Sequence, residues 1–152
     1  LIIDAGALMC IDKNKPFSDR LIITPHPGEA ARMLNIPVSE VQADRYKTVR
    51  KLYDLYQCLI VLKGSGTIIF DGESMYTCMD GNYKMATAGM GDTLCGILLT
   101  ELASLKNNLE ACIKGVVFHS YSSDILYEKS NNKNITPSMV SDKYSELTHH
   151  DN

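Results

Sequence analysis

Several features are missing from this chain of 152 residues, and each absence excludes a class of function. The net charge of −3 comes without any basic run, which argues against nucleic-acid binding. No apolar run reaches the length of a membrane span, because Lys and Glu interrupt the longest ones. No Cys-x-x-Cys pair occurs, so neither a zinc site nor a disulfide framework is expected. The pattern favours buried, reduced thiols in a cytoplasmic protein for the five cysteines, Cys10, Cys58, Cys78, Cys95 and Cys112.

The most informative stretch that is present runs from position 81 to 103 and reads GNYKMATAGMGDTLCGILLTELA. Gly89 and Gly91 crowd a turn, Asp92 follows, and an almost wholly apolar segment begins at Leu94. This order predicts a glycine-rich loop that enters the N-terminus of a buried helix, where backbone N–H groups and the helix dipole favour phosphate. Asp92 is then placed to take a proton from a hydroxyl that attacks phosphorus. The alternative is that Asp92 only caps the helix.

Short apolar runs alternate with helical patterns along the rest of the chain. The runs predict strands, with a hairpin at Asp71-Gly72-Glu73 between the last two, over residues 1–3, 21–23, 58–62, 67–70 and 74–78. Helices are predicted over 5–11, from Pro27, over 92–105 and 109–128, and from 136. A longer helix is predicted from Ser39, with a capping box to Gln42. Its inner stripe is Val41, Arg45, Val49, Leu52, Tyr53 and Tyr56, with the Arg45 side chain extending along the surface to keep its charge in water. Polar loops are expected at 13–19 and 130–134. The alternation indicates an α/β domain with a mainly parallel sheet flanked by helices.

Polar residues follow the buried strands directly. In sheets of this class, ligands bind at the carboxyl ends of the strands, so Asp4, the segment Thr24–Glu29 and the segment Lys63–Thr67 should share one edge with the glycine loop. Lys63 beside Gly-Ser-Gly is expected to face an anion, although it could also point to solvent. Two further alternatives are that Glu29 serves only the helix dipole and that His26 only caps or packs the helix.

These segments together resemble a known family. The order Thr24-Pro25-His26-Pro27-Gly28-Glu29, Lys63-Gly64-Ser65-Gly66-Thr67 and Met85-Ala86-Thr87-Ala88-Gly89-Met90-Gly91-Asp92 is similar to the motifs of the NAD(P)HX dehydratases, members of the ribokinase-like superfamily. The opening Asp4-Ala5-Gly6-Ala7-Leu8 resembles a further element of that family. The chain departs from the family pattern at Met9, Ala88 and Thr93, where Asn, Gly and Val are usual. It also lacks the N-terminal half of the family domain.

The resemblance implies a metabolite-repair lyase that restores NADH and NADPH from their hydrates, using ADP or ATP as phosphoryl donor and Mg²⁺ with no ligand assigned. The residues of these motifs resemble those of the bacterial members, which implies that ADP is the phosphoryl donor. The implied catalytic base is Asp92, and the N–H groups from Gly89 to Gly91 would form the anion hole for the transferred phosphoryl group. The implied substrate-binding residues are Thr24, Pro25, His26, Pro27, Gly28, Glu29 and Asp92. The implied nucleotide-binding residues are Lys63, Gly64, Ser65, Gly66, Thr67, Asn82, Met85, Ala86, Met90 and Gly91.

Two other functions stay open at this point: a vitamin-precursor kinase of the same superfamily, and a nucleotide-binding remnant without catalysis. The chain begins at Leu1 without Met, as though within a strand, so we expect residues 1–148 to be the C-terminal portion of a single ribokinase-like domain and 149–152 a frayed tail. Expressed alone, such a portion should be unstable or self-associated. A homo-oligomer, with a tetramer as one form, is also expected.

Overall fold

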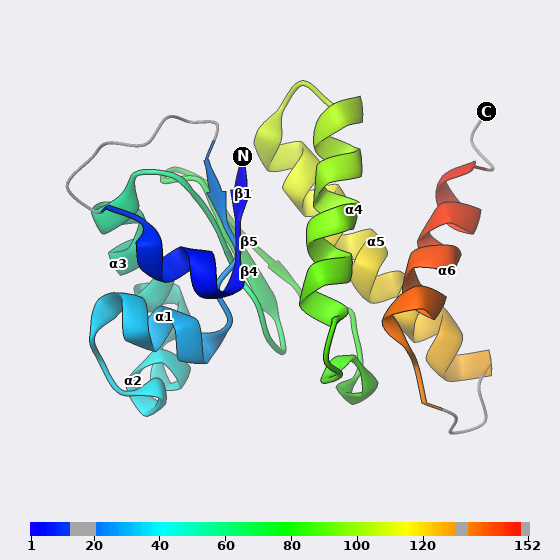
Figure 1. Ribbon diagram of the computed structural model, residues 1–152, viewed down its shortest axis with the longest axis horizontal. Coiled ribbons are helices and arrows are strands. Elements are labelled where there is room, and N and C mark those ends of the chain that lie inside the picture. Colours follow the sequence, from blue (N-terminus) through cyan, green and yellow to red (C-terminus); the bar gives the residue numbers. More distant parts are fainter. Residues whose placement is uncertain (13–20, 130–133, 150–152) are drawn as a thin grey trace. The chain divides into compact units, whose positions relative to one another are not determined.

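The computed structural model describes residues 1–12, 21–129 and 134–149, which Figure 1 shows as coloured ribbon. The chain divides into two compact units, Leu1–Thr77 and Cys78–Asn152, each with packing of its own. The predicted loop at 13–19, most of the loop at 130–134 and the last three residues of the predicted tail lie outside the described residues. His149, where that tail was expected to begin, still belongs to the last helix.

The first unit is built on a five-stranded sheet in the order β1-β2-β3-β4-β5. The strands are β1 (Ile2–Ile3), β2 (Ile22–Ile23), β3 (Leu59–Leu62), β4 (Thr67–Phe70) and β5 (Met75–Cys78). The first three pair in parallel, with Ile2 opposite Ile22 and Ile22 opposite Leu59, whereas β4 runs antiparallel to β3. The predicted α/β class is therefore confirmed. The sheet is mixed because the β4–β5 hairpin adds antiparallel pairing to the parallel strands that lead to the site.

Helices of the first unit gather on one face of this sheet (Figure 1). They are the 3₁₀ helix η1 (Ala5–Cys10), α1 (Pro27–Leu34), α2 (Val38–Ala43) and α3 (Arg45–Tyr56). Their apolar side chains and those of the strands form one core, whose most buried members include Leu8, Ile23, Ala30, Val41, Val49, Leu52, Ile60 and Leu62. Burial of each leucine or isoleucine contributes about 1.5–3 kcal/mol, so this core holds the strand ends in place.

The prediction of one long helix from Ser39 is wrong, because the chain forms two helices there. Pro37 is the N-cap residue of α2, which ends at Ala43, and Asp44 breaks the helical backbone with φ −149° and ψ 88°. The Asp44 carboxylate accepts a hydrogen bond from the Lys47 N–H at 2.8 Å and so caps α3. Aspartate competes well for this role, which explains why a local cap overrides the continuous apolar stripe.

The second unit is helical. It contains the 3₁₀ helix η2 (Tyr83–Met85), α4 (Met90–Ser104), α5 (Asn108–Lys129) and α6 (Pro137–His149), close to the predicted bounds. Helix α5 packs against both α4 and α6. Gly115 permits the close approach of α4, since a Cβ there would lie 2.8 Å from the Leu98 side chain. The prediction that α4 is buried holds for one face only, because Leu99 is 55% exposed.

Two further expectations are corrected. The strand predicted as buried at residues 1–3 is an edge strand in which Ile2 and Ile3 are half-buried and Leu1 is 76% exposed, because β1 has only β2 beside it among the described strands. All five cysteines are free thiols, but only Cys58, Cys78 and Cys112 are buried, whereas Cys10 is exposed. Burial raises the pKa of Cys58 and of Cys112 to about 12, so these thiols are unreactive.

Candidate functional site

The carboxyl ends of the three parallel strands carry a cluster of polar side chains. Lys63, directly after β3, places its Nζ 2.5 Å from Oδ1 of Asp4, which follows β1, and 4.0 Å from Oε2 of Glu29. Thr24, directly after β2, is fully buried, with its Oγ1 3.4 Å from the Ile3 carbonyl oxygen. The prediction that these strand ends share one edge is therefore confirmed within the first unit. That the glycine loop shares the same edge stays a prediction.

Asp4 is held as a carboxylate at this edge. Burial raises its pKa, but the hydrogen bond and charge of Lys63, with hydrogen bonds from Thr24 and the Ala5 backbone, outweigh burial and lower the pKa below its usual value. Lys63 therefore faces two carboxylates of its own unit rather than open solvent. Its predicted contact with a nucleotide phosphate stays a prediction.

His26 and Glu29 cap α1 reciprocally. The His26 Nδ1 accepts hydrogen bonds from the N–H groups of Gly28 (3.0 Å) and Glu29 (3.2 Å), while the buried Glu29 carboxylate accepts from the His26 N–H at 2.7 Å. Pro27 occupies the first helical position, as predicted. His26 therefore caps α1, and its predicted contact with the substrate stays a prediction. About half of its side chain remains exposed, and its Nε2 lies 3.4 Å from Oε1 of Glu29.

Arg45 shapes the segment from Lys63 to Thr67, and sequence reasoning missed this role. Its guanidinium, expected only to lie along the α3 surface with its charge in water, donates to the carbonyls of Leu62 (3.1 Å), Lys63 (3.2 Å) and Ser65. Gly64 has φ +136°, and a Cβ there would lie 3.2 Å from the Arg45 Nη2. Only glycine fits this backbone and this close approach. The segment is therefore a fixed turn whose carbonyls already have a partner.

The predicted anion loop lies in the second unit at the start of α4. Gly89 is the N-cap residue with φ +86°, and no side chain caps the helix. Asp92 is exposed in the first turn, so the alternative that it serves as the N-cap residue is excluded. The Met90 N–H donates to the Thr87 carbonyl at 3.2 Å. Of the amides predicted to bind phosphate, Met90 is therefore engaged, while those of Gly89 and Gly91 have no hydrogen-bond partner among the described residues.

The other predicted nucleotide-binding residues of this unit lie just before the loop. Asn82 caps η2 by accepting from the Lys84 N–H at 3.1 Å, and its amide nitrogen donates to Ser123 and Asp124 of α5. The Asn82 side chain is therefore committed to the fold. Met85 is half-buried at the end of η2, and Ala86 is exposed after it. Sequence reasoning missed the partners on α5, because a helical pattern does not show which loop its polar residues contact.

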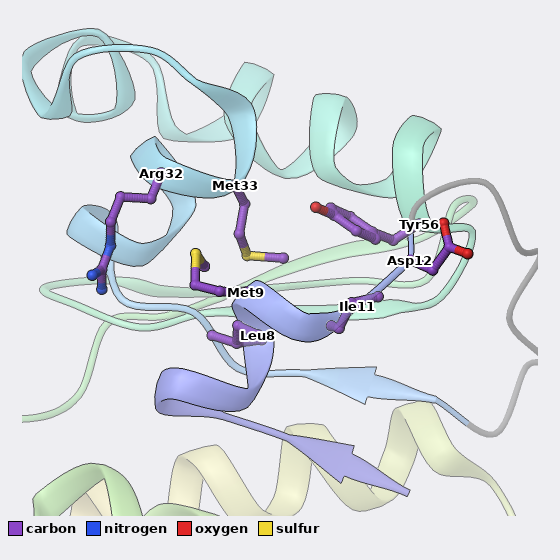
Figure 2. Close-up of a pocket in the computed structure, with 7 residues that line it drawn as sticks. All are labelled: Leu8, Met9, Ile11, Asp12, Arg32, Met33 and Tyr56. Atoms are coloured by element: carbon purple, nitrogen blue, oxygen red, sulfur yellow. The ribbon is translucent and has the colours of Figure 1, made fainter.

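One hollow of about 300 Å³ lies in the first unit, away from the predicted residues (Figure 2). Side chains of η1, the residues after it, α1 and the end of α3 line this hollow, with Arg32 and Asp12 at opposite ends. The lining contains none of the predicted site residues, so the hollow carries no part of the predicted chemistry. No group of three metal-ligating side chains occurs among the described residues, and within the same part of the chain no helix is long and apolar enough to cross a membrane.

Comparison with known proteins accounts for the ordered motifs. A family model described as NAD(P)H-hydrate dehydratase matches residues 1–146. The chain belongs to the NAD(P)H-hydrate dehydratase family. The family resemblance inferred from the sequence is thereby confirmed.

Individual relatives agree with this membership. The bifunctional NAD(P)H-hydrate repair enzyme Nnr of Vibrio cholerae is 43% identical over 122 residues, covering 80% of this chain and 25% of the relative. The ADP-dependent (S)-NAD(P)H-hydrate dehydratase of Neisseria meningitidis is 36% identical over 137 residues, covering 86% of this chain and 46% of the relative.

A solved structure extends the agreement to the fold. The ADP/ATP-dependent NAD(P)H-hydrate dehydratase of Bacillus subtilis, co-crystallized with ATP and Mg²⁺, superposes with a TM-score of 0.87 at 31% identity, covering 98% of this chain and 54% of that one. The fold is therefore ribokinase-like, as predicted. The chain spans between a quarter and about half of the length of these members of the dehydratase family.

Proposed function

We propose that this chain forms part of an enzyme that dehydrates NAD(P)HX, the hydrated form of NADH or NADPH, with ADP as phosphoryl donor. Membership of the dehydratase family supports the reaction, and the Neisseria relative, named as ADP-dependent, supports the donor. The observation that carries the proposal is the start of α4. There Gly89 is the N-cap residue, no side chain caps the helix, and the exposed Asp92 lies one turn further on. A place for an anion and a proton acceptor therefore lie next to each other.

The first step is phosphoryl transfer to the hydroxyl group on the hydrated nicotinamide ring. Asp92 takes the hydroxyl proton as the oxygen attacks the terminal phosphorus of ADP, and AMP leaves with the electrons of the broken P–O bond. The N–H groups of Gly89 and Gly91, together with the positive end of the α4 dipole, stabilise the charge on the transferred phosphoryl group. A positioned base contributes about 10²–10⁴ in rate to such a step.

The second step is elimination. The ring C–O bond breaks, phosphate leaves with the bonding electrons, and loss of a proton from the neighbouring ring carbon restores the double bond of NAD(P)H. Hydroxide is a poor leaving group and phosphate is a good one. This difference explains why a hydro-lyase would use a kinase-like fold, which first phosphorylates the hydroxyl group.

The remaining residues would bind the two substrates. Thr24 to Glu29 would contact the hydrated dinucleotide, with the half-exposed His26 ring as the contact best supported by its position. The turn from Lys63 to Thr67 would contact ADP. Mg²⁺ is expected with the nucleotide, but the described residues offer no set of ligands for it, so we assign none and derive no step from it. A cytoplasmic location, a homo-oligomer and a longer ribokinase-like domain also stay predictions.

A donor-dependence assay on the protein at its natural length tests the proposal. NADHX is incubated with enzyme and ADP, with ATP, or without nucleotide, while the near-ultraviolet absorbance of NADH is followed. The proposal expects absorbance to return only when nucleotide is present. A vitamin-precursor kinase would leave NADHX unchanged but phosphorylate a hydroxymethylpyrimidine or thiazole alcohol. A nucleotide-binding remnant would bind ADP without either reaction.

A further inference from the structure

One face of α5 lies under the segment from Gly81 to Met90. Two adjoining rows of α5 carry the contacting residues, because His119 and Ser123 are four positions apart, as are Ser120 and Asp124. The Asp124 carboxylate accepts from the Gly81 N–H at 2.7 Å and from the Asn82 side-chain amide at 2.8 Å. The Ser123 hydroxyl lies 3.0 Å from the same amide. One carboxylate therefore fixes both the backbone and a side chain where the segment begins.

The fit at Gly81 shows that this contact is tight. Gly81 has φ +105°, and a Cβ there would lie 3.0 Å from the Met85 sulfur and 3.6 Å from the Ser120 side chain. Glycine is therefore required both by the backbone conformation and by the space between η2 and α5. The segment rests directly on the helix.

A second contact holds the other end of the segment. His119 is 5% exposed and forms a hydrogen bond with the backbone of Met90, the first residue of α4. Its buried Nε2 has no hydrogen-bond partner among the described residues. The next two residues are Gly91 and Asp92, so the histidine fixes the backbone directly before the proposed base.

We propose that Asp124 and His119 are positioning residues that hold the two ends of the Gly81–Met90 segment on α5 and so preorganise its nucleotide-binding backbone. This inference rests on the proposed function for the nature of the ligand. Holding a loop in its bound conformation strengthens binding because less conformational entropy is lost when the ligand binds. Without these contacts the segment would have to be ordered by ADP itself, and ADP affinity would fall.

The first test compares Asp124→Asn with Glu128→Gln, which removes the same charge from an exposed position one turn further along α5. Binding of ADP to the protein at its natural length is measured by titration calorimetry. Because Asn cannot accept both hydrogen bonds, we expect Asp124→Asn to raise the Kd for ADP about 10-fold or more, in line with the loss of one hydrogen bond to a charged group. Glu128→Gln should bind ADP as the wild type does.

The second test separates positioning from general stability. His119→Leu removes the bond to Met90, whereas His119→Asn keeps a side chain that can donate a hydrogen bond. We expect the leucine variant to raise the KM for ADP far more than it changes the KM for NAD(P)HX, and the asparagine variant to restore most of the loss. Glu101→Gln, which weakens the same unit at the far end of α4, should lower the unfolding temperature without changing the KM for ADP.

Hydrogen exchange makes the inference testable apart from the proposed function. The amides of Gly81, Lys84, Met85, Ala86 and Met90, which all donate hydrogen bonds, should lose protection in Asp124→Asn and His119→Leu but not in Glu128→Gln, even without nucleotide. Wild-type protection in both variants, or wild-type ADP affinity in folded Asp124→Asn, would overturn the inference. If the wild type neither binds ADP nor dehydrates NAD(P)HX, the proposed function fails, and the inferred ligand fails with it. The exchange result then decides whether α5 holds the segment.

Discussion

At the scale of single residues, Lys63 sets the ionisation of the strand-end cluster. Replacing it in Lys63→Met should raise the pKa of Asp4, because burial is then opposed only by the hydrogen bonds from Thr24 and the Ala5 backbone. A carboxyl NMR titration measures this pKa. Lys51→Met, which breaks the exposed pair with Glu40, is the matched control and should leave Asp4 unchanged. An Asp4 pKa that stays low in Lys63→Met would show that Lys63 is not its cause.

His119 predicts a pH dependence of stability. Burial lowers its pKa to about 4, against a smaller opposing effect of the bond with Met90. The folded pKa lies below the unfolded value near 6.5, so the full contribution is present above pH 6.5 and is lost progressively towards pH 4. Each pH unit within that window lowers the free energy of unfolding by about 1.4 kcal/mol.

Urea denaturation at pH 7 and at pH 5 measures this effect. The wild type should lose roughly 2 kcal/mol more than His119→Asn between the two pH values, since the variant has no imidazole to protonate. The same loss in both proteins would mean that His119 is not the buried neutral base described here.

At the scale of elements, a buried carboxylate joins the three long helices. Glu101 of α4 is 1% exposed, accepts from the Tyr144 hydroxyl of α6 at 2.8 Å and pairs with Lys114 of α5 at 3.0 Å. Tyr144→Phe should destabilise the protein by about 1.5–3 kcal/mol, because a buried carboxylate loses a hydrogen bond. Thermal and urea unfolding check this. Tyr121→Phe, at an exposed position on α5, should be neutral, and equal stability of the two variants would contradict the role of Glu101.

The same scale shows what the sequence could predict. The hairpin and the bounds of α4 and α5 followed from turn residues and apolar periodicity, which are local signals. The break at Asp44 was missed because its cap competes with a stripe that continues across it. Arg45 was expected at a helix surface, but its partners are carbonyls of Leu62, Lys63 and Ser65, far away in the sequence.

The candidate site divides in the same way. The sequence motifs predicted Asp92, Lys63 and His26 as site residues because glycine and proline mark the turns around them. The sequence did not predict Asp124 or His119, since a helical pattern does not show which loop a polar side chain contacts. Burial of Glu101 was equally hidden, because its partners come from two other helices.

At the scale of the whole molecule, the proposed dehydration has two substrates. The motif spellings and the ADP-dependent Neisseria relative lead us to expect better turnover of NAD(P)HX with ADP than with ATP. Matched assays at equal Mg²⁺ compare kcat/KM for the two nucleotides. A clear preference for ATP would show that the donor prediction is wrong while leaving the dehydration itself intact.

The central claim is that Asp92 is the base for phosphoryl transfer, and Asp92→Asn tests it most directly in the protein at its natural length. The variant keeps the shape of the side chain and the whole backbone of the loop, so ADP should bind with nearly wild-type affinity by calorimetry. Dehydration of NAD(P)HX should fall by about 10²–10⁴, because the hydroxyl proton has lost its acceptor. Near-wild-type turnover by this variant would contradict this claim, since Asp92 would then only stabilise the N-terminus of α4 through its interaction with the helix dipole.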